Sequence, residues 1–440
     1  MNLRYLLVPF TLLLFHFATN EAFDQRRISS FLDKSILKKS DFQWKGPAGG
    51  SYHLADWNGK PDPTLLWRKF LLKVTNKFQP LLHHVNWKEG KVQDEKRRDE
   101  FPCPLNDTRS PVQPVNIHQL RPGDIDVVAA IGDSLSSGNG AMSATALGAY
   151  TEFRGMSFSG GGMQDWTTLL TLPNILKVFN PNLYGFATEN VLSRDLAAHL
   201  NVAEPNALSR DLVQQVQILI QRMQQDPRVD MPRHWKLLTI LIGSNDFCMD
   251  MCHQDNMFKF LKQHEEDLRK ALTLLRNNVP RLMVNLIPAP NLVYLQQQLK
   301  TLPGIYKIPL GLACSCLVNR FYTPEYLQKA SELISRWQAV DEHIAGLAEF
   351  HTSDFTVIYQ QFMANLTIPH LSNGFIDLRY FGKDGIHFSQ FGHAAVANLL
   401  WNNMVQGSGQ EDLDLRQPFE NFECPTAERP YILTMKNKNE

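Results

Sequence analysis

The sequence has no excess charge of either sign and only six cysteines in 440 residues. Its 44 Lys and Arg balance 44 Asp and Glu, so it lacks the basic excess that nucleic-acid binding requires. We therefore predict no nucleic-acid partner. Six cysteines are too few for a small disulfide scaffold and fit a few bridges in a protein with its own core. Hydrophobic residues make up 43% of the chain, as expected for a folded globular protein.

Long apolar runs are also missing beyond the N-terminus. Leu6–Ala18 is almost wholly apolar and follows a short positive end, a layout typical of a secretory signal peptide, which we place at residues 1–22. This run is shorter than the roughly 20 residues that span a bilayer, so no transmembrane anchor is expected. The glycosylation sequons at Asn106 and Asn365 agree with secretion. We predict a secreted, extracellular protein.

The remaining chain divides by composition into three parts. Residues 23–110 form an N-terminal extension with an expected helix at Leu65–Phe78 and a charge run, Lys91–Glu100, interpreted as a solvated linker. Residues 111–405 form the main domain, and residues 406–440 form a polar tail. No internal repeat of 20 to 50 residues is present, which argues against a solenoid.

Short apolar runs in the main domain alternate with helix-period segments. The expected strands are Ile125–Ile131, Trp235–Ile242, Leu282–Ile287 and Phe355–Tyr359, and the clearest helices are Leu208–Met223 and Tyr326–Ala345. This alternation predicts a three-layer α/β/α fold of flavodoxin-like type with a mostly parallel sheet. Reactive groups in such folds lie beyond the carboxyl ends of the strands.

Polar motifs follow two of these strands. Gly132–Leu135 (GDSL) follows the first, where a serine in a tight turn before a helix exposes its hydroxyl. Gly243–Asp246 (GSND) follows the Trp235–Ile242 strand, and the Asn245 amide there can donate to a developing oxyanion. The alternatives are an ordinary turn for the first motif and a helix cap for the second.

A third motif lies near the end of the domain. Asp384 and His387 stand three residues apart, a spacing that allows the carboxylate to orient the imidazole for proton abstraction. His393 could pair with His387 at a metal, but cysteine or acidic ligands at a recognisable spacing are missing. We therefore expect no metal.

The three motifs, in this chain order, resemble the SGNH (GDSL) hydrolase family. The resemblance implies an esterase without metal or cofactor, with Ser134 as nucleophile, His387 as base and Asp384 as the residue that orients it. It also implies that the Ser134 N–H and the Asn245 side chain are oxyanion donors. Asp246 is the alternative acid, because it adjoins Asn245.

Finer motifs are similar to one repeat of the membrane-associated phospholipase B proteins. They are Arg154–Gly162 (RGMSFSGGG), Thr171–Lys177 (TLPNILK), Phe179–Pro181 (FNP), Phe101–Cys103 (FPC) and Cys424–Pro425 (CP). This resemblance covers roughly residues 100–435. It implies hydrolysis of acyl esters of phospholipids and lysophospholipids, with transient contact at a lipid interface. The segment Leu169–Phe186 is then either an acyl-chain pocket or lid, or ordinary core packing.

One position departs from the family pattern. The family places a glycine after its second strand as a third oxyanion donor, and Asn206 stands at the expected place here. Asparagine tolerates the left-handed backbone better than most residues, and its N–H remains a donor. Gly161 or Gly162 is the alternative donor. Two other functions stay open: an esterase or acyltransferase acting on a small or carbohydrate ester, and a non-catalytic lipid-binding protein on the same scaffold.

Secretion predicts disulfides among the six cysteines, which permit 15 pairings. From their positions we expect a Cys248–Cys252 bridge beside the GSND motif and a Cys103–Cys424 bridge that joins the domain ends. Cys314 and Cys316 would form a third bridge or remain free thiols.

Overall fold

The computed structural model describes residues 44–45, 51–52, 63–95, 101–254, 256, 258–298, 304–319, 321–364, 366, 369–406 and 418–437. The expected signal peptide and the sequon residue Asn365 lie outside these residues. The chain forms two compact units, Met1–Leu66 and Trp67–Glu440. In the first unit, β1 (Trp44–Lys45) pairs antiparallel with β2 (Ser51–Tyr52).

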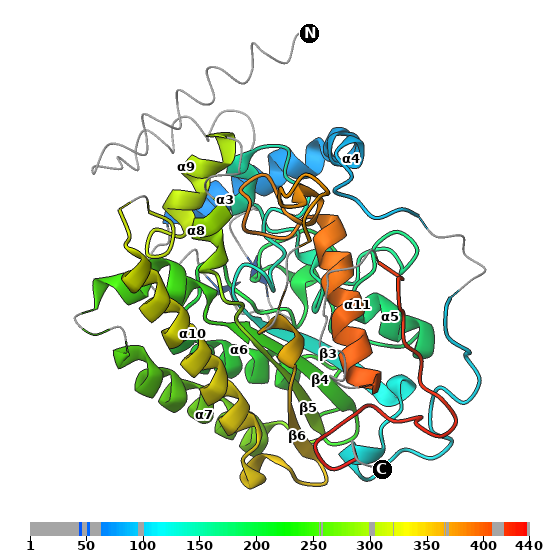
Figure 1. Cartoon of the computed structure of the whole chain (residues 1–440). Coiled ribbons are helices and arrows are strands. Elements are labelled where there is room, and N and C mark those ends of the chain that lie inside the picture. Colours follow the sequence, from blue (N-terminus) through cyan, green and yellow to red (C-terminus); the bar gives the residue numbers. More distant parts are fainter. Residues whose placement is uncertain are drawn as a thin grey trace. The chain divides into compact units, whose positions relative to one another are not determined.

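A parallel sheet of four strands organises the second unit (Figure 1). The strands confirm the sequence prediction and run in the order β3 (Ile125–Gly132), β4 (Trp235–Ile242), β5 (Leu282–Pro288) and β6 (Phe355–Tyr359). They are mostly apolar and buried along nearly their whole length, because both sheet faces are covered.

The segment that corresponds to the second strand of the family pattern is reduced to isolated bridges. Val127 pairs with Tyr184 and Ala130 with Asn201, both parallel, on the edge of β3 opposite β4. The Val128 N–H donates to the Tyr184 carbonyl at 2.8 Å. This segment therefore extends the sheet beside β3 and leads directly to Asn206.

Helices cover both faces of the sheet, which confirms the three-layer α/β/α fold (Figure 1). Alternate strand residues face opposite layers, so Leu237 and Leu241 join one core cluster and Leu238 and Ile240 join the other. The first cluster includes α5 (Leu172–Phe179) and α11 (Gln390–Gln406). The second includes α6 (Leu212–Gln225), α7 (Lys259–Asn278) and the end of α10 (Pro324–Ala345). The short α8 (Tyr294–Gln298) and α9 (Gly304–Ala313) precede α10.

More of the region before the sheet belongs to the main domain than its composition indicates. The helices α3 (Pro63–Lys77) and α4 (Gln79–Lys88) come first, and from Trp67 on these residues belong to the same unit as the sheet. The interpretation of Lys91–Glu100 as a solvated linker is wrong at its beginning, because Lys91 and Gln93 are buried. Residues 96–100 lie outside the described part. The segment Leu169–Phe186 contributes α5 and packs into the core.

All six cysteines form disulfides, but two of the three expected pairings are wrong. The structure contains the expected bridge Cys103–Cys424. Cys248 pairs with Cys314 rather than Cys252, and Cys252 pairs with Cys316. The two bridges run side by side and tie the segment after Asn245 to the end of α9. No helix in the described ranges is long and apolar enough to cross a membrane.

Candidate active site

Ser134 lies in a tight turn at the carboxyl end of β3. Gly132 has a φ of +136°, and a Cβ there would lie 2.0 Å from the Leu241 carbonyl oxygen, so only glycine fits. The turn closes by hydrogen bonds from Ser137 N–H to the Asp133 carbonyl at 3.1 Å and from Asn139 N–H to the Ser134 carbonyl at 3.0 Å. The strand end and turn thus present the Ser134 hydroxyl beyond the sheet.

A hairpin before α11 brings His387 and Asp384 to this serine. Ser134 Oγ lies 2.8 Å from His387 Nε2, and His387 Nδ1 hydrogen-bonds to Asp384 Oδ2. The other carboxylate oxygen, Oδ1, accepts the backbone N–H groups of Ile386 and His387, each at 3.2 Å. With Nδ1 donating to Asp384, Nε2 presents its lone pair to the hydroxyl, as a general base requires.

The electrostatics of the pair agree with this arrangement. Burial raises the pKa of Asp384, but the charge and hydrogen bond of His387 outweigh it and hold the pKa below its usual value. Burial lowers the pKa of His387, yet the adjacent Asp384 carboxylate outweighs that effect and raises the pKa above 6.5. The carboxylate therefore stabilises the imidazolium that forms when His387 takes the serine proton.

Candidate oxyanion donors lie at the strand end after β4 and in the loop that is hydrogen-bonded to it. Asn245 Nδ2 donates one hydrogen to the Ala207 carbonyl at 2.9 Å, which fixes the amide and leaves its second hydrogen. Asn206 precedes Ala207 and has the left-handed φ of 62° that a glycine would supply. The backbone N–H groups of Ser134 and Asn206 make no hydrogen bond to any residue that the structure describes. These three groups can donate to a substrate oxygen.

Gly161 and Gly162 do not supply a donor. The Gly162 N–H donates to the Ala187 carbonyl at 2.8 Å, and the Gly161 N–H donates to the Ser157 carbonyl at 2.9 Å. A Cβ at Gly162 would lie 2.2 Å from the Phe186 ring. The sequence interpretation of Gly162 as an oxyanion donor is therefore wrong, and this glycine instead makes room for an aromatic side chain.

Asp246, the alternative acid, points to a different partner. Its carboxylate accepts the Ser209 N–H, at 3.0 Å to the nearer oxygen, while Asp384 occupies His387 Nδ1. Burial raises the pKa of Asp246 to about 8. Asp246 therefore joins the strand end to the loop that carries Asn206, rather than acting on His387.

A buried polar chain that the sequence analysis missed continues from this loop. Ser209 Oγ lies 2.6 Å from His264 Nδ1, and His264 Nε2 lies 2.7 Å from Asp341 Oδ1. All three side chains are buried, so no substrate reaches them. These two hydrogen bonds instead connect the loop after Asn206 to α7 and α10. A polar residue on the apolar face of α7, His264, is the sequence signal that would have indicated it.

Of the two histidines considered for a metal, His387 has partners on both ring nitrogens, whereas His393 has a partner on Nδ1 and none on its buried Nε2 among the described residues. His393 Nδ1 accepts the Phe158 N–H at 3.3 Å. Among the described residues, the one group with ligand-like spacing is Cys252, His253 and Cys316. Its two sulfurs form a disulfide and offer no thiolates.

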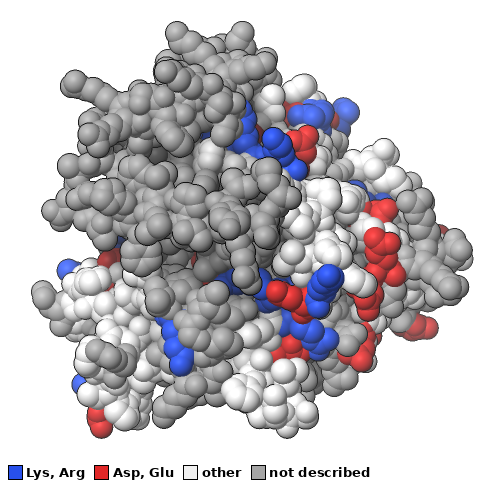
Figure 2. All heavy atoms as spheres, turned by 90° about the horizontal axis from the view of Figure 1, so that it is seen from above, with Lys and Arg blue, Asp and Glu red and all other residues white. Residues whose placement is uncertain are grey.

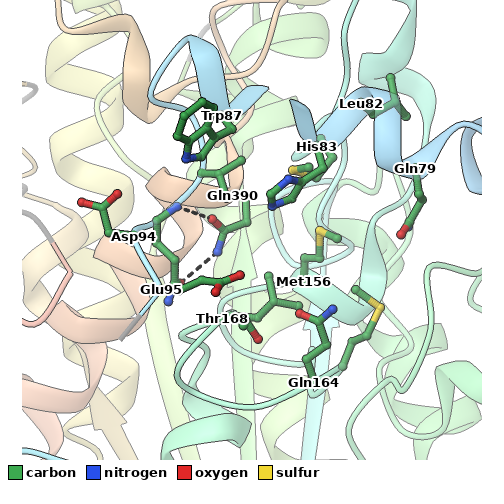
Figure 3. A pocket seen from close by; sticks show the side chains of 15 residues that line it. Gln79, Leu82, His83, Trp87, Asp94, Glu95, Met156, Gln164, Thr168 and Gln390 are labelled. Carbon is green, nitrogen blue, oxygen red and sulfur yellow. Dashed lines mark hydrogen bonds between the residues drawn. The ribbon is translucent and has the colours of Figure 1, made fainter. Parts of the chain in front are cut away.

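A cavity of about 340 Å³ lies beside the catalytic hairpin (Figure 3). One wall comes from α4 and the residues that follow it, and the other contains three methionines and Gln390. The lining residues are Gln79, Leu82, His83, Trp87, Val92, Gln93, Asp94, Glu95, Met142, Met156, Met163, Gln164, Thr168, Leu169 and Gln390. Ser134 and His387 do not line it, so the cavity is a neighbour of the serine rather than its binding site.

Figure 2 views the molecule from the end at which α3 and α4 lie in Figure 1. Basic and acidic side chains of the described residues lie next to one another there, in keeping with the balanced composition. Long-range attraction of a strongly charged partner to this face is not favoured by such a distribution.

Comparisons with known proteins agree with the geometry. The family model for GDSL-like lipase/acylhydrolase matches residues 128–400. The chain is 34% identical over 423 residues to membrane-associated phospholipase B1 of Homo sapiens, covering 92% of this chain and 28% of that protein. It is 35% identical over 334 residues to the Rattus norvegicus protein of the same name, covering 74% and 23%. The chain thus spans about a quarter of the length of these relatives.

An extracellular lipase of Streptomyces rimosus aligns with 15% identity and a TM-score of 0.31, over 61% of this chain and 94% of that one.

Proposed function

Because the chain belongs to the GDSL-like lipase/acylhydrolase family, we propose that it is a secreted serine esterase acting on phospholipids and lysophospholipids through an acyl-enzyme. Family membership makes it a carboxylic ester hydrolase, and the phospholipase B1 relatives favour a lipid ester. The observation that carries the mechanism is the 2.8 Å contact between Ser134 Oγ and His387 Nε2, with Asp384 on the opposite ring nitrogen.

Acylation begins at the ester carbonyl. Ser134 Oγ attacks the carbonyl carbon while its proton passes to His387 Nε2. The negative charge that develops on the carbonyl oxygen is stabilised by the Ser134 N–H, the Asn245 amide and the Asn206 N–H. The intermediate then expels the glycerol oxygen, which takes the proton from His387. The products are an acyl-Ser134 ester and the deacylated lipid.

Deacylation repeats these steps with water. His387 removes a proton from water, and the hydroxide attacks the acyl carbon of the Ser134 ester. The second intermediate collapses to a fatty acid, and His387 returns the proton to Ser134 Oγ. Since the same donors serve both intermediates, the site needs no further group.

Covalent labelling tests the nucleophile, the base and the oxyanion donors together. An alkyl fluorophosphonate should react once per molecule, and peptide mass mapping should place the adduct on Ser134. Ser134→Ala should abolish both labelling and ester hydrolysis, because no other described hydroxyl contacts His387. The exposed helical Ser335→Ala is the matched control and should change neither. Labelling at another serine would contradict the assignment.

A substrate panel separates the remaining activities. The rate of hydrolysis per fluorophosphonate-labelled molecule should be compared for four substrates at equal bulk concentration. They are phosphatidylcholine, lysophosphatidylcholine, triglyceride and an acetylated sugar. We expect the two phospholipids to be hydrolysed fastest. Preference for the acetylated sugar would favour the small-ester alternative. Lipid binding without labelling would favour a non-catalytic lipid-binding protein.

Secretion is proposed from the N-terminal sequence, the two sequons and the oxidised state of all six cysteines. Asn106 is exposed, as a glycan acceptor must be. Expression in a secreting eukaryotic cell should release the chain into the medium with a mobility shift on deglycosylation. An exclusively intracellular, unglycosylated product would contradict this part of the proposal.

A further inference from the structure

The catalytic Asp384 and His387 lie at the tip of a small hairpin. Its arms pair through a bridge between Phe381 and Phe388, and the Gly382 N–H donates to the His387 carbonyl at 2.7 Å. This hairpin carries both the base and its acid, so any tilt of its arms displaces His387 from Ser134. What holds the arms therefore sets the distance between nucleophile and base.

Lys91 contacts the first arm from the segment that follows α4. Its side chain is buried, with 3% of its surface exposed. The ammonium donates to the Leu378 carbonyl at 2.6 Å and to the Phe381 carbonyl. Two residues earlier, Glu89 forms an ion pair with Lys383, which adjoins Asp384. A buried cation is costly unless its donors are satisfied, and here backbone carbonyls of the hairpin and its approach satisfy them.

The first turn of α11, which follows the second arm directly, is held by the same segment. The Phe391 N–H donates to the Lys91 carbonyl at 2.9 Å. The Gln93 N–H donates to Gln390 Oε1 at 2.6 Å, and Gln390 Nε2 returns a bond to Gln93 Oε1 at 2.9 Å. Figure 3 shows Gln390 with these bonds as dashed lines. Gln93 is also buried, and its Oε1 accepts the Leu170 N–H at 2.7 Å.

The segment reaches the nucleophile side as well. Asn86 Nδ2 donates to the Met142 carbonyl at 3.1 Å, and the Gln390 N–H donates to the Ala141 carbonyl at 2.9 Å. A Cβ on the neighbouring Gly140 would lie 3.5 Å from His387 Cβ. The loop after Ser134 and the hairpin of His387 are thus joined through residues 86–93.

We infer that Lys91 and Gln93 are positioning residues for the proposed esterase reaction, and that residues 86–93 act as a clamp on the hairpin of Asp384 and His387. The inference rests on the proposed function and concerns residues before the matched family region 128–400. In this proposal neither Lys91 nor Gln93 contacts the substrate carbonyl. Lys91 binds the first arm and Gln93 binds the start of α11 that follows the second arm, so that together they keep His387 Nε2 within hydrogen-bond distance of Ser134 Oγ.

The charges around Lys91 make its replacement informative. Burial and the neighbouring Lys383 lower the pKa of Lys91 to about 8, against the opposing influence of Glu89, Asp384 and Asp377. Lys91→Met keeps the length of the side chain but removes both hydrogen bonds. Lys91→Arg keeps a cation with several donors.

The test compares Lys91→Met, Lys91→Arg and Gln93→Ala with the exposed Lys77→Met, at the end of α3 and outside the clamp, as matched control. Turnover of a short soluble p-nitrophenyl ester is measured per fluorophosphonate-labelled site. For Lys91→Met and Gln93→Ala we expect kcat to fall tenfold or more with KM within about twofold, since small displacements of catalytic groups cost up to about 100-fold. Lys91→Arg should recover most of the rate, and Lys77→Met should match the parent protein.

Hydrogen exchange of the peptide covering residues 380–389 supplies a readout independent of activity. Exchange should accelerate in Lys91→Met and Gln93→Ala, and if one of these variants does not fold, the other still tests the clamp. Unchanged exchange with unchanged kcat, even at a lowered Tm, would overturn the inference. Accelerated exchange in a parent protein inactive on every ester would support the clamp and contradict the proposed function instead.

Discussion

Replacing Asp384 by asparagine tests the proposed roles of the acid and the base most directly. Asp384 Oδ1 accepts two backbone N–H groups, from Ile386 and His387, and Oδ2 accepts His387 Nδ1–H. In Asp384→Asn the carbonyl oxygen must stay where the two N–H groups point, because an NH₂ group there would face two donors. The new NH₂ group therefore faces His387 Nδ1.

The size of the effect follows from this geometry. An NH₂ donor opposite Nδ1 requires an imidazole with its proton on Nε2, and that tautomer cannot accept the Ser134 proton. Loss of the correct tautomer in a serine hydrolase costs about 10⁴ in kcat. This corresponds to about 5.5 kcal/mol of transition-state stabilisation. We expect a loss of that order in Asp384→Asn.

The assay is the pH dependence of kcat/KM on a soluble p-nitrophenyl ester. In the parent protein, activity should rise with pH as His387 loses its proton, with a midpoint above 6.5 because the pKa of His387 is raised. Without the carboxylate, burial becomes the main influence and lowers the pKa. The residual activity of Asp384→Asn should therefore rise at a lower pH.

Asp246→Asn is the matched control for the competing assignment. Among the other described residues, the Asp246 carboxylate accepts the Ser209 N–H, and an amide oxygen can replace that bond. We expect a loss of less than about tenfold, since the side chain has no contact with His387. The reasoning is refuted if Asp384→Asn keeps near-parental turnover, or if Asp246→Asn is as damaging.

Three further predictions concern the oxyanion donors and the stability of the domain. Asn245→Ala should lower kcat by about 10² to 10³ with little change in KM, measured on the same ester. Arg68→Ala should lower the free energy of unfolding by about 3 kcal/mol in urea titrations, because the buried Glu152 and the partly buried Glu204 would then depend on the single cation Arg154. Arg109→Ala, which breaks an exposed pair with Asp126, should cost less than about 1 kcal/mol. Replacing Cys103 and Cys424 together by serine should cost about 5 kcal/mol, since this bridge closes a separation of 321 residues. An unchanged unfolding midpoint in Arg68→Ala would refute the ion-pair argument, and one in the double cysteine variant would refute the disulfide argument.

The sheet and the positions of Ser134, Asn245 and His387 could be predicted because local pattern determines them. Buried parallel strands are continuous apolar runs, and polar residues directly after such runs lie at one edge of the sheet. The left-handed backbone of Asn206 was also within reach, since asparagine is among the few residues that adopt it.

The disulfide pairings and the clamp depend instead on contacts distant in sequence. Cys248 and Cys252 are close in the chain, but each finds its partner 64 to 66 residues further on, after α9. Lys91 appears in a charged run, and only the folded chain shows that carbonyls of Leu378 and Phe381 surround its ammonium. Neither composition nor spacing contains that information.

The Cys103–Cys424 bridge brings the two borders of the esterase domain to one point, with 5.3 Å between their Cα atoms. Because its two ends lie close together, such a domain can be inserted at a single point of a longer polypeptide. Copies can then follow one another on short connectors, and none has to distort its neighbour. This geometry suits relatives more than three times as long, in which the stretch that matches this chain accounts for 28% of the protein.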